Sequence, residues 1–162
     1  MPSQSKKVKT TAGEVNNMQF IFIPFESIGP FKLDDDVKNY SEILSIYKHE
    51  QVNQYGSEYY TYPKRESDYG SHFLQVKEGK IRTVFCYDSV IFQGTNLMGL
   101  NINEFGKITN SNYIGEIYEA DIFEDEPPMY EYEFDYIGVS VRTHYEKIVD
   151  IAISGHSSYE ED

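Results

Sequence analysis

Aromatic and acidic side chains alternate towards the C-terminal end of the chain, and this alternation constrains the fold more than any other feature. The segment MYEYEFD runs from Met129 to Asp135, with an apolar or aromatic residue at every second position and a carboxylate between them. A β-strand places successive side chains on opposite faces, whereas a helix would mix the two classes around its circumference. The pattern therefore predicts a strand with one buried face and one negatively charged face.

The stretch around this strand is unusually acidic. From Glu116 to Asp135 the chain has nine carboxylates and no Lys or Arg. It is too apolar for a disordered acidic tail, and it suits contact with a basic protein. The candidate binding residues are Glu116, Tyr118, Glu119, Asp121, Glu124, Asp125, Glu126, Tyr130, Glu131, Tyr132, Glu133 and Asp135, helped by Asp34, Asp35 and Asp36. The alternative interpretation is an edge hairpin whose acids only keep a tyrosine-rich strand soluble.

Composition limits the partners and the compartment. A net charge of −13 over 162 residues excludes attraction to nucleic acid or to an anionic membrane surface. The single cysteine, Cys86, allows no internal disulfide, which is typical of a reducing, cytoplasmic location. No apolar stretch approaches the roughly 20 residues of a membrane helix. The length suits one domain over residues 18–155, with a flexible polar leader over 1–17 and an acidic tail over 156–162.

Two short helices are expected. The first begins after Asp34–Asp36, whose oxygens can cap it. The second begins after Asn101, which can form a capping box with Glu104. The apolar residues at helical spacing that define the first helix are Val37, Tyr40, Ile43, Leu44, Ile46 and Tyr47, and those of the second are Ile102, Phe105 and Ile108.

Strand patterns fill most of the remainder. Hairpins are expected through Glu78-Gly79 and through Tyr145-Glu146, and the run 18–25 is expected to be a strand buried on both faces. The fold class is therefore α+β, a single antiparallel sheet of about six to eight strands with two helices on one face. Both halves contain a glycine turn, a capped helix and a hairpin, and they align loosely around Leu33 and Leu100. An internal two-fold repeat and chance similarity both remain open.

Motifs for chemistry are sparse. The chain has no GxSxG, P-loop or GxGxxG pattern, and its histidines lack metal-ligand spacing, so no catalytic residue, metal or cofactor is expected. A rival hypothesis is a small cytosolic enzyme or ligand carrier, with a pocket between helices and sheet that uses tyrosines and His72 or His144. A third is an assembly subunit that pairs through its edge strand. The four histidines are His49, His72, His144 and His156.

Three segments resemble immunity proteins that are encoded beside bacterial polymorphic toxins, of the contact-dependent growth inhibition type. They are FIFIPFESIGPFKLDDDVKNYSEIL, FLQVKEGKIRTVFCYDSVIFQGTNLMGLNINEF and GVSVRTHYEKIVDIAI, within residues 18–155. The chain departs from that pattern at Ser27, where a glycine is usual, and at Asp34-Asp35. The resemblance implies a non-catalytic monomer that binds and neutralises the toxic C-terminal domain of a cognate effector. Such domains are frequently nucleases with basic active sites, which an acidic inhibitor would complement.

Overall fold

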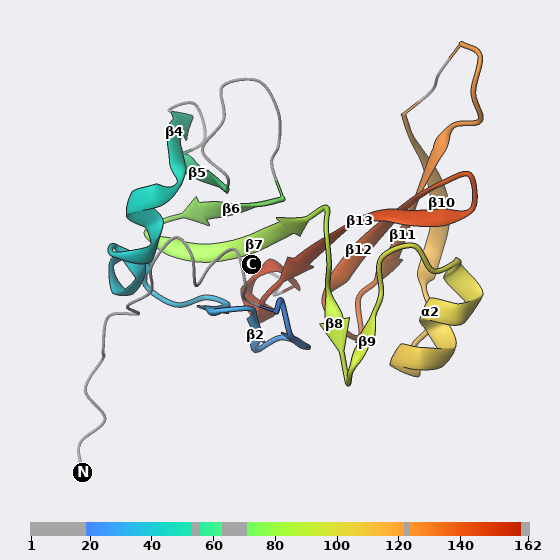
Figure 1. The fold of residues 1–162 in the computed structure, drawn as a ribbon, viewed down its shortest axis with the longest axis horizontal. Helices are drawn as coiled ribbons and strands as arrows, with labels where there is room; N and C mark the ends of the chain where they lie inside the picture. The colour runs from blue at the N-terminus through green and yellow to red at the C-terminus, as the bar shows by residue number, and fades with distance from the viewer. Residues whose placement is uncertain (1–18, 53–55, 63–70, 122–123, 160–162) are drawn as a thin grey trace.

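The main element of the fold is an antiparallel sheet of eight strands (Figure 1). The computed structural model describes residues 19–52, 56–62, 71–121 and 124–159. The strands lie in the order β10-β11-β12-β13-β7-β6-β5-β4, so two four-stranded meanders meet where β13 pairs with β7. Their bounds are β4 Lys48–Val52, β5 Ser57–Tyr62, β6 His72–Lys77, β7 Lys80–Cys86, β10 Ile114–Asp121, β11 Met129–Phe134, β12 Val139–His144 and β13 Lys147–Ser154.

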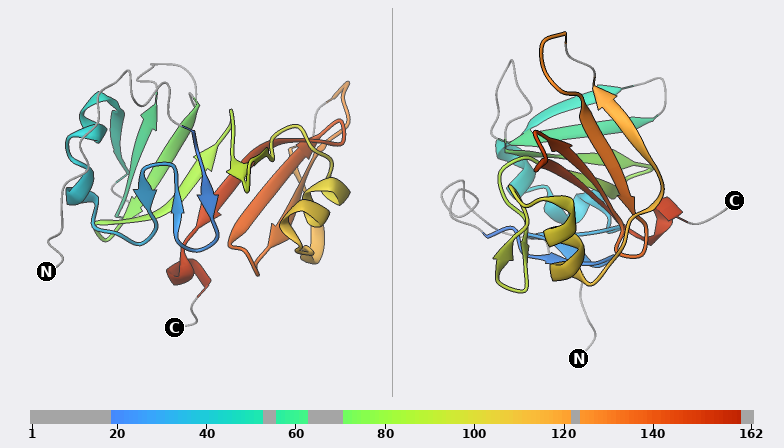
Figure 2. Two further views of the ribbon diagram at one scale, coloured as in Figure 1. Left: turned by 60° about the horizontal axis from the view of Figure 1, so that its bottom comes forward. Right: turned by 90° about the vertical axis from the view of Figure 1, so that its right-hand side faces the viewer.

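Smaller elements cover one side of this sheet (Figure 2). Over the described ranges they are two small antiparallel sheets, one α-helix and three 3₁₀ helices. Their bounds are β1 Phe22–Ile23, β2 Ser27–Ile28, β3 Phe31–Lys32, β8 Ile91–Phe92, β9 Thr95–Asn96, α2 Ile102–Thr109, η1 Val37–Tyr40, η2 Ile43–Ile46 and η3 His156–Tyr159. No helix in the described ranges is long and apolar enough to cross a membrane.

The hydrophobic core lies between the main sheet and these covering elements. Leu74, Val84, Ile153 and Val139 are cross-strand neighbours on four successive strands, and all four are fully buried. Because alternate residues of a strand share a face, this row and its neighbours form one continuous apolar surface. Burying each such side chain contributes about 1.5–3 kcal/mol.

The predicted α+β fold with two helices on one face is wrong, because the structure is mostly β and has one α-helix in its described part. In place of the first predicted helix the chain forms η1 and η2. The Tyr40 hydroxyl accepts a hydrogen bond from the amide of Lys32 at 2.9 Å and donates one to the Asp35 carboxylate at 2.9 Å. These bonds tie the first turn to β3, and polar residues that favour turns interrupt the segment, so short 3₁₀ turns replace a continuous helix.

Two other expectations fail at the N-terminal side. The run 18–25, of which residues 19–25 are described, is not buried on both faces: Phe20 and Phe22 are buried, whereas Ile21 and Ile23 are about half exposed. This strand lies in a small surface sheet, so one face meets solvent. The segments aligned around Leu33 and Leu100 also lead into different structures, 3₁₀ turns in one case and α2 in the other.

The local predictions for α2 and for both hairpins are confirmed. The side chain of Asn101 accepts from the Glu104 amide at 2.8 Å, and the Glu104 carboxylate accepts from the Asn101 amide at 3.3 Å, which completes the capping box. The expected leader lies outside the described residues. Of the expected acidic tail, residues 156–159 form η3, where the His156 ring stacks on Phe25 with centroids 4.3 Å apart.

Candidate partner-binding site

Strand β11 separates its aromatic side chains from its carboxylates. Tyr132 pairs with buried Val141 on β12. The ring centroids of Phe134 and of Phe105 on α2 are 4.6 Å apart, so both aromatic side chains face the covered side of the sheet. Glu131 and Glu133 therefore point to the opposite side of the sheet, the open face. The predicted alternation is present, but its two classes of side chain do not form one surface on this strand.

The carboxylates on the open face gather around one arginine. Arg142 on β12 pairs with Glu131 across the strands, and its Nε donates to Asp150 Oδ1 at 2.9 Å. Its Nη1 also lies 3.9 Å from Asp121 Oδ2. Burial raises the pKa of Glu131, and the carboxylate of Glu133 adds to this increase. The open face is therefore partly neutralised, and it is not a simple row of negative charge.

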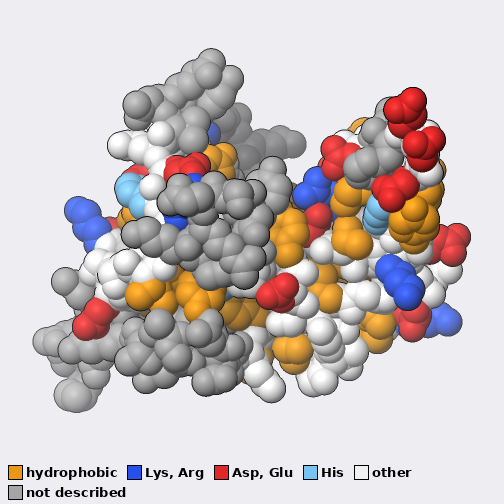
Figure 3. Space-filling model, turned by 45° about the horizontal axis from the view of Figure 1, so that its top comes forward, with side chains coloured by type: hydrophobic (Ala, Val, Ile, Leu, Met, Phe, Trp, Pro, Cys, Tyr) orange, Lys and Arg blue, Asp and Glu red, His pale blue; other side chains and the backbone are white. Residues whose placement is uncertain are grey.

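The strongest uncompensated charge lies on the acidic hairpin, defined as the described residues between Ile114 and Phe134 (Figure 3). Its strand β10 is the edge of the sheet and is exposed almost throughout. The exposed carboxylates are Glu116, Glu119, Asp121, Glu124, Asp125 and Glu126. Within the described part of the chain, only Asp121 and Glu126 have a basic side chain within 4 Å, namely Arg142 and His144.

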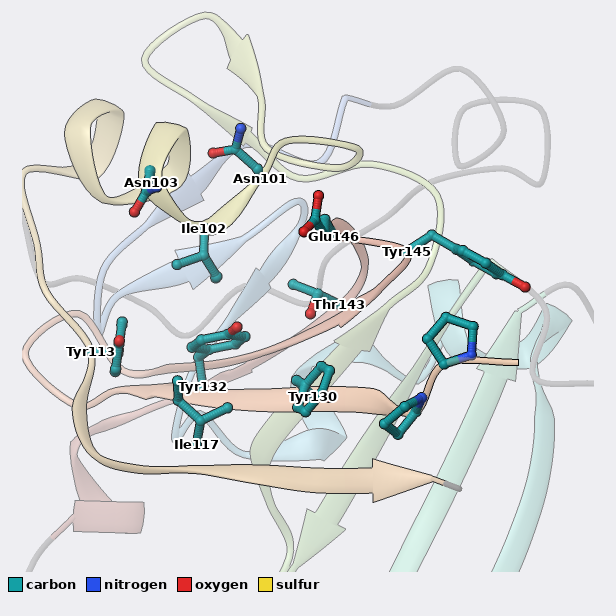
Figure 4. Close-up of a pocket in the computed structure, with 12 residues that line it drawn as sticks. Asn101, Ile102, Asn103, Tyr113, Ile117, Tyr130, Tyr132, Thr143, Tyr145 and Glu146 are labelled. Atoms are coloured by element: carbon teal, nitrogen blue, oxygen red, sulfur yellow. The ribbon is translucent and has the colours of Figure 1, made fainter. Parts of the chain in front are cut away.

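A pocket of about 820 Å³ lies between this hairpin, the start of α2 and the turn between β12 and β13 (Figure 4). We name it the tyrosine pocket because four tyrosines line it. The described residues around it include one carboxylate and no Lys, Arg or His. They are Asn101, Ile102, Asn103, Tyr113, Ile117, Pro127, Pro128, Tyr130, Tyr132, Thr143, Tyr145 and Glu146.

The pocket has an ordered aromatic floor. Figure 4 shows Tyr130 and Tyr132 standing side by side on β11, facing Ile102 of α2. The rings of Tyr113 and Tyr132 meet edge to face, with centroids 5.1 Å apart. Burial raises the pKa of Tyr132. A hydrogen bond with Thr143 acts to lower this pKa, whereas the nearby carboxylate of Glu146 acts to raise it.

The turn that forms one rim of the pocket is strained. Tyr145 and Glu146 have φ of 52° and 64°, so both residues occupy the left-handed region. A two-residue hairpin turn of this kind usually contains Asn and Gly, because other residues lose about 1–2 kcal/mol there. The β6–β7 turn in this chain follows that rule with Gly79, whereas the β12–β13 turn keeps two large side chains that both line the pocket.

A smaller hollow of about 470 Å³ adjoins the tyrosine pocket and shares Ile102, Asn103 and Tyr113 with it. Lys107 and Ser111 are among its other lining residues. The Ser111 hydroxyl is buried and has no hydrogen-bond partner. The concave surface beside α2 is thus longer than the tyrosine pocket alone.

The predicted helper residues lie elsewhere. The segment Asp34–Asp36 packs against the start of β7, on the opposite side of the molecule from the acidic hairpin (Figure 1). Asp34 accepts hydrogen bonds from Arg82 at 3.0 Å and from the Ser157 hydroxyl. Burial acts to raise the pKa of Asp34, but these bonds outweigh burial and lower the pKa below its usual 3.8. The structure therefore does not bring Asp34–Asp36 together with the other predicted site residues.

Several pocket residues were not among the predicted site residues. Tyr113 precedes β10, Ile102 and Asn103 begin α2, and Tyr145 and Glu146 lie in a turn far along the chain. Only the last two carried a local signal, because Tyr-Glu at the centre of a two-residue hairpin turn is an unusual choice. The others reach the pocket through the packing of α2 onto β11, which no local pattern encodes.

The two histidines of the rival hypothesis do not line the pocket. His72 is buried in the core, where its Nε2 lies 2.6 Å from the Tyr47 hydroxyl and its Nδ1 lies 2.9 Å from Ser71 Oγ. The Nε2 of His144 lies 3.1 Å from the carbonyl oxygen of Pro127 and 3.8 Å from Glu126 Oε2. Among the described residues, no group of three or more His, Cys, Asp or Glu side chains is arranged to hold a metal ion.

Comparison with known proteins identified no relative of this chain. No protein-family model, no curated protein and no solved structure matches the chain.

Proposed function

We propose that this protein is an immunity protein, which binds and neutralises the toxic C-terminal domain of a contact-dependent growth inhibition toxin or a related polymorphic toxin. The resemblance of three sequence segments to such proteins supports the assignment as an immunity protein. The acidic hairpin supports binding of the toxin domain through complementary charge. We further propose that the toxin domain is a nuclease, because a nuclease needs a basic cleft for its phosphate-bearing substrate.

One observation carries the proposal: a cluster of carboxylates without basic partners lies on the hairpin at one edge of the main sheet. Glu124 and Asp125 are exposed at the tip of the acidic hairpin and have no basic side chain within 4 Å in the described part of the chain. Figures 1 and 2 show the described part of the connection between β10 and β11, residues 124–128, projecting beyond the rest of the sheet. A projecting acidic element suits a concave basic surface in both shape and charge.

The charge also has a kinetic consequence. With a net charge of −13 and six exposed carboxylates on the acidic hairpin, the protein attracts a basic partner before contact. Such steering raises association rates by about 10- to 1,000-fold and weakens with added salt. At 0.15 M ionic strength the attraction acts over about 8 Å, so the tip carboxylates contribute more than acids on the far side.

The test starts from the genes on either side of this one: if they encode a large secreted protein, its C-terminal domain is co-expressed with this protein and its binding is measured. The tip variant Glu124→Gln, Asp125→Asn, Glu126→Gln should reduce the association rate by about tenfold at low salt. A control with the same charge change, Glu42→Gln, Glu50→Gln, Glu78→Gln, should reduce it less than twofold. Failure of the unaltered protein to bind that domain or to protect cells from it would refute the proposal, and equal losses in the two variants would refute the hairpin as the binding element.

A further inference from the structure

We infer that the tyrosine pocket receives an arginine side chain of the basic partner. This inference rests on the proposed function and extends it, because it assigns the specific contact to the face of the hairpin opposite the open-face carboxylates. The following observations carry it: the aromatic lining, the distribution of charge around the pocket, and the strained turn at its rim.

The aromatic lining suits a flat cation. Tyr130 and Tyr132 lie side by side, and Tyr113 meets Tyr132 at 73° between ring planes. Such an arrangement offers ring faces in more than one direction to a group that enters between α2 and β11. A guanidinium stacks on tyrosine faces through cation–π attraction, which contributes most where water is excluded.

The charged side chain that lines the pocket is a carboxylate, and the nearest described basic groups, His144 and Lys107, lie outside the lining. Glu146 lines the pocket, and Glu119 pairs with Tyr130 across β10 and β11, which places it on the same face of the sheet. Local desolvation raises the pKa of the Tyr145 hydroxyl, and the nearby carboxylate of Glu126 raises it further. No described cation lines the pocket, so a bound cation would supply the missing countercharge.

The turn at the rim of the pocket contains one aromatic and one acidic residue, Tyr145 and Glu146. Tyr145 and Glu146 adopt positive φ where Asn-Gly would relieve the strain. Strain of this kind is concentrated at functional sites, because the side chains present there serve a purpose other than stability. Here the two side chains supply a ring and a carboxylate to the same pocket.

Arginine fits better than the other side chains a partner could insert. An apolar side chain would bury the polar groups of Asn103 and Glu146 without giving them a partner. A lysine ammonium is compact and strongly hydrated, whereas a guanidinium can stack on a ring and donate in its plane to a carboxylate at the same time. The pocket volume of about 820 Å³ leaves room for the residues that flank the arginine.

The first experiment uses three peptides, acetyl-Gly-Arg-Gly-amide and its lysine and citrulline counterparts. Each is titrated into the full chain with ¹³C-labelled tyrosine rings, and NMR shifts are followed. The arginine peptide should shift the resonances of Tyr113, Tyr130, Tyr132 and Tyr145, and the neutral citrulline peptide should bind at least tenfold more weakly. Equal binding of arginine and citrulline, equal binding of arginine and lysine, or shifts confined to other tyrosines would overturn the inference.

Variants then separate the pocket from the general negative charge. Glu146→Gln should weaken the arginine peptide about fivefold, and Tyr145→Asn with Glu146→Gly should weaken it at least tenfold. The matched control is Tyr136→Asn, which changes an exposed tyrosine of the neighbouring β11–β12 turn outside the pocket and should leave the affinity unchanged. An equal effect of Tyr136→Asn would overturn the assignment to the pocket.

Binding of the toxin domain distinguishes failure of this inference from failure of the proposed function. If the tip variant weakens the toxin complex and the Tyr145→Asn, Glu146→Gly variant does not, the proposed function stands and the arginine site is refuted. If both variants weaken it, both proposals are supported. If the unaltered protein does not bind the toxin domain, the proposed function fails, and the peptide titration still decides whether the pocket selects arginine.

Discussion

Arg142 on β12 and Asp150 on β13 are cross-strand neighbours, and the guanidinium Nε donates to the carboxylate Oδ1 at 2.9 Å. Asp150 is 6% exposed, so its charge depends on this arginine for compensation. Burial raises the pKa of Asp150 even with Arg142 in place. The folded protein therefore binds this proton more tightly than the unfolded chain does, and ionisation of Asp150 opposes folding as the pH rises above 3.8.

The substitution Arg142→Met should lower the free energy of unfolding by about 2–3 kcal/mol at pH 7, because it leaves a buried carboxylate without a partner. The loss should be smaller at pH 4.5, because burial without Arg142 favours the neutral carboxyl as the pH falls. Urea denaturation at both pH values measures the difference. Adding Asp150→Asn should recover most of the lost stability at pH 7, and a loss independent of pH would contradict this account.

His72 predicts a second pH dependence, of opposite sign. Burial lowers the pKa of His72 to about 3. The unfolded chain binds a proton near pH 6.5 and the folded protein does not, so stability is present above 6.5 and is lost as the pH falls. The free energy of unfolding should fall by about 2 kcal/mol between pH 6.5 and 5.

The substitution His72→Gln should make the protein less stable at pH 7 but should remove this dependence. The control His49→Gln, at an exposed histidine of β4, should retain it. Denaturation curves at pH 7, 6 and 5 provide the measurement. If the free energy of unfolding of His72→Gln still falls between pH 6.5 and 5, a group other than His72 causes the pH dependence.

The β12–β13 turn predicts a gain in stability from two substitutions. Tyr145→Asn with Glu146→Gly should raise the free energy of unfolding by about 1–2 kcal/mol, because both positions have positive φ. Thermal denaturation measures the gain. Glu78→Asn in the β6–β7 turn, where Gly79 already occupies the second position, should produce a smaller gain. No gain in the double variant would mean that Tyr145 and Glu146 make contacts that outweigh the strain.

Asp34 is expected to stabilise the folded protein and not to contribute to binding of the toxin domain. It joins Arg82 on β7 to Ser157 of η3, 75 residues further along the chain from Arg82. Asp34→Ala should lower the free energy of unfolding by about 1–3 kcal/mol and leave the affinity for the toxin domain unchanged. Calorimetric titration of the folded variant checks the second part. A tenfold loss of affinity without loss of stability would restore Asp34 to the binding surface.

Local patterns predicted the elements whose signals lie within a few residues. The capping box of Asn101 and Glu104 marks the start of α2, and Glu78-Gly79 marks the β6–β7 turn. In both cases the hydrogen bonds or backbone angles that define the element belong to neighbouring residues. The first predicted helix failed because Tyr40 bonds back to Lys32 and Asp35, a contact that helical spacing does not reveal.

Local sequence patterns also predicted only part of the candidate site. The alternation of MYEYEF by itself determined that tyrosines and carboxylates occupy opposite faces of β11, because a strand has a period of two. Which face became a pocket was decided by the packing of Phe105 on Phe134, which brings α2 over the tyrosines. Which carboxylates stay uncompensated was decided by the position of Arg142 on the neighbouring strand. Both depend on contacts between residues distant in the chain, so only the tertiary structure could determine them.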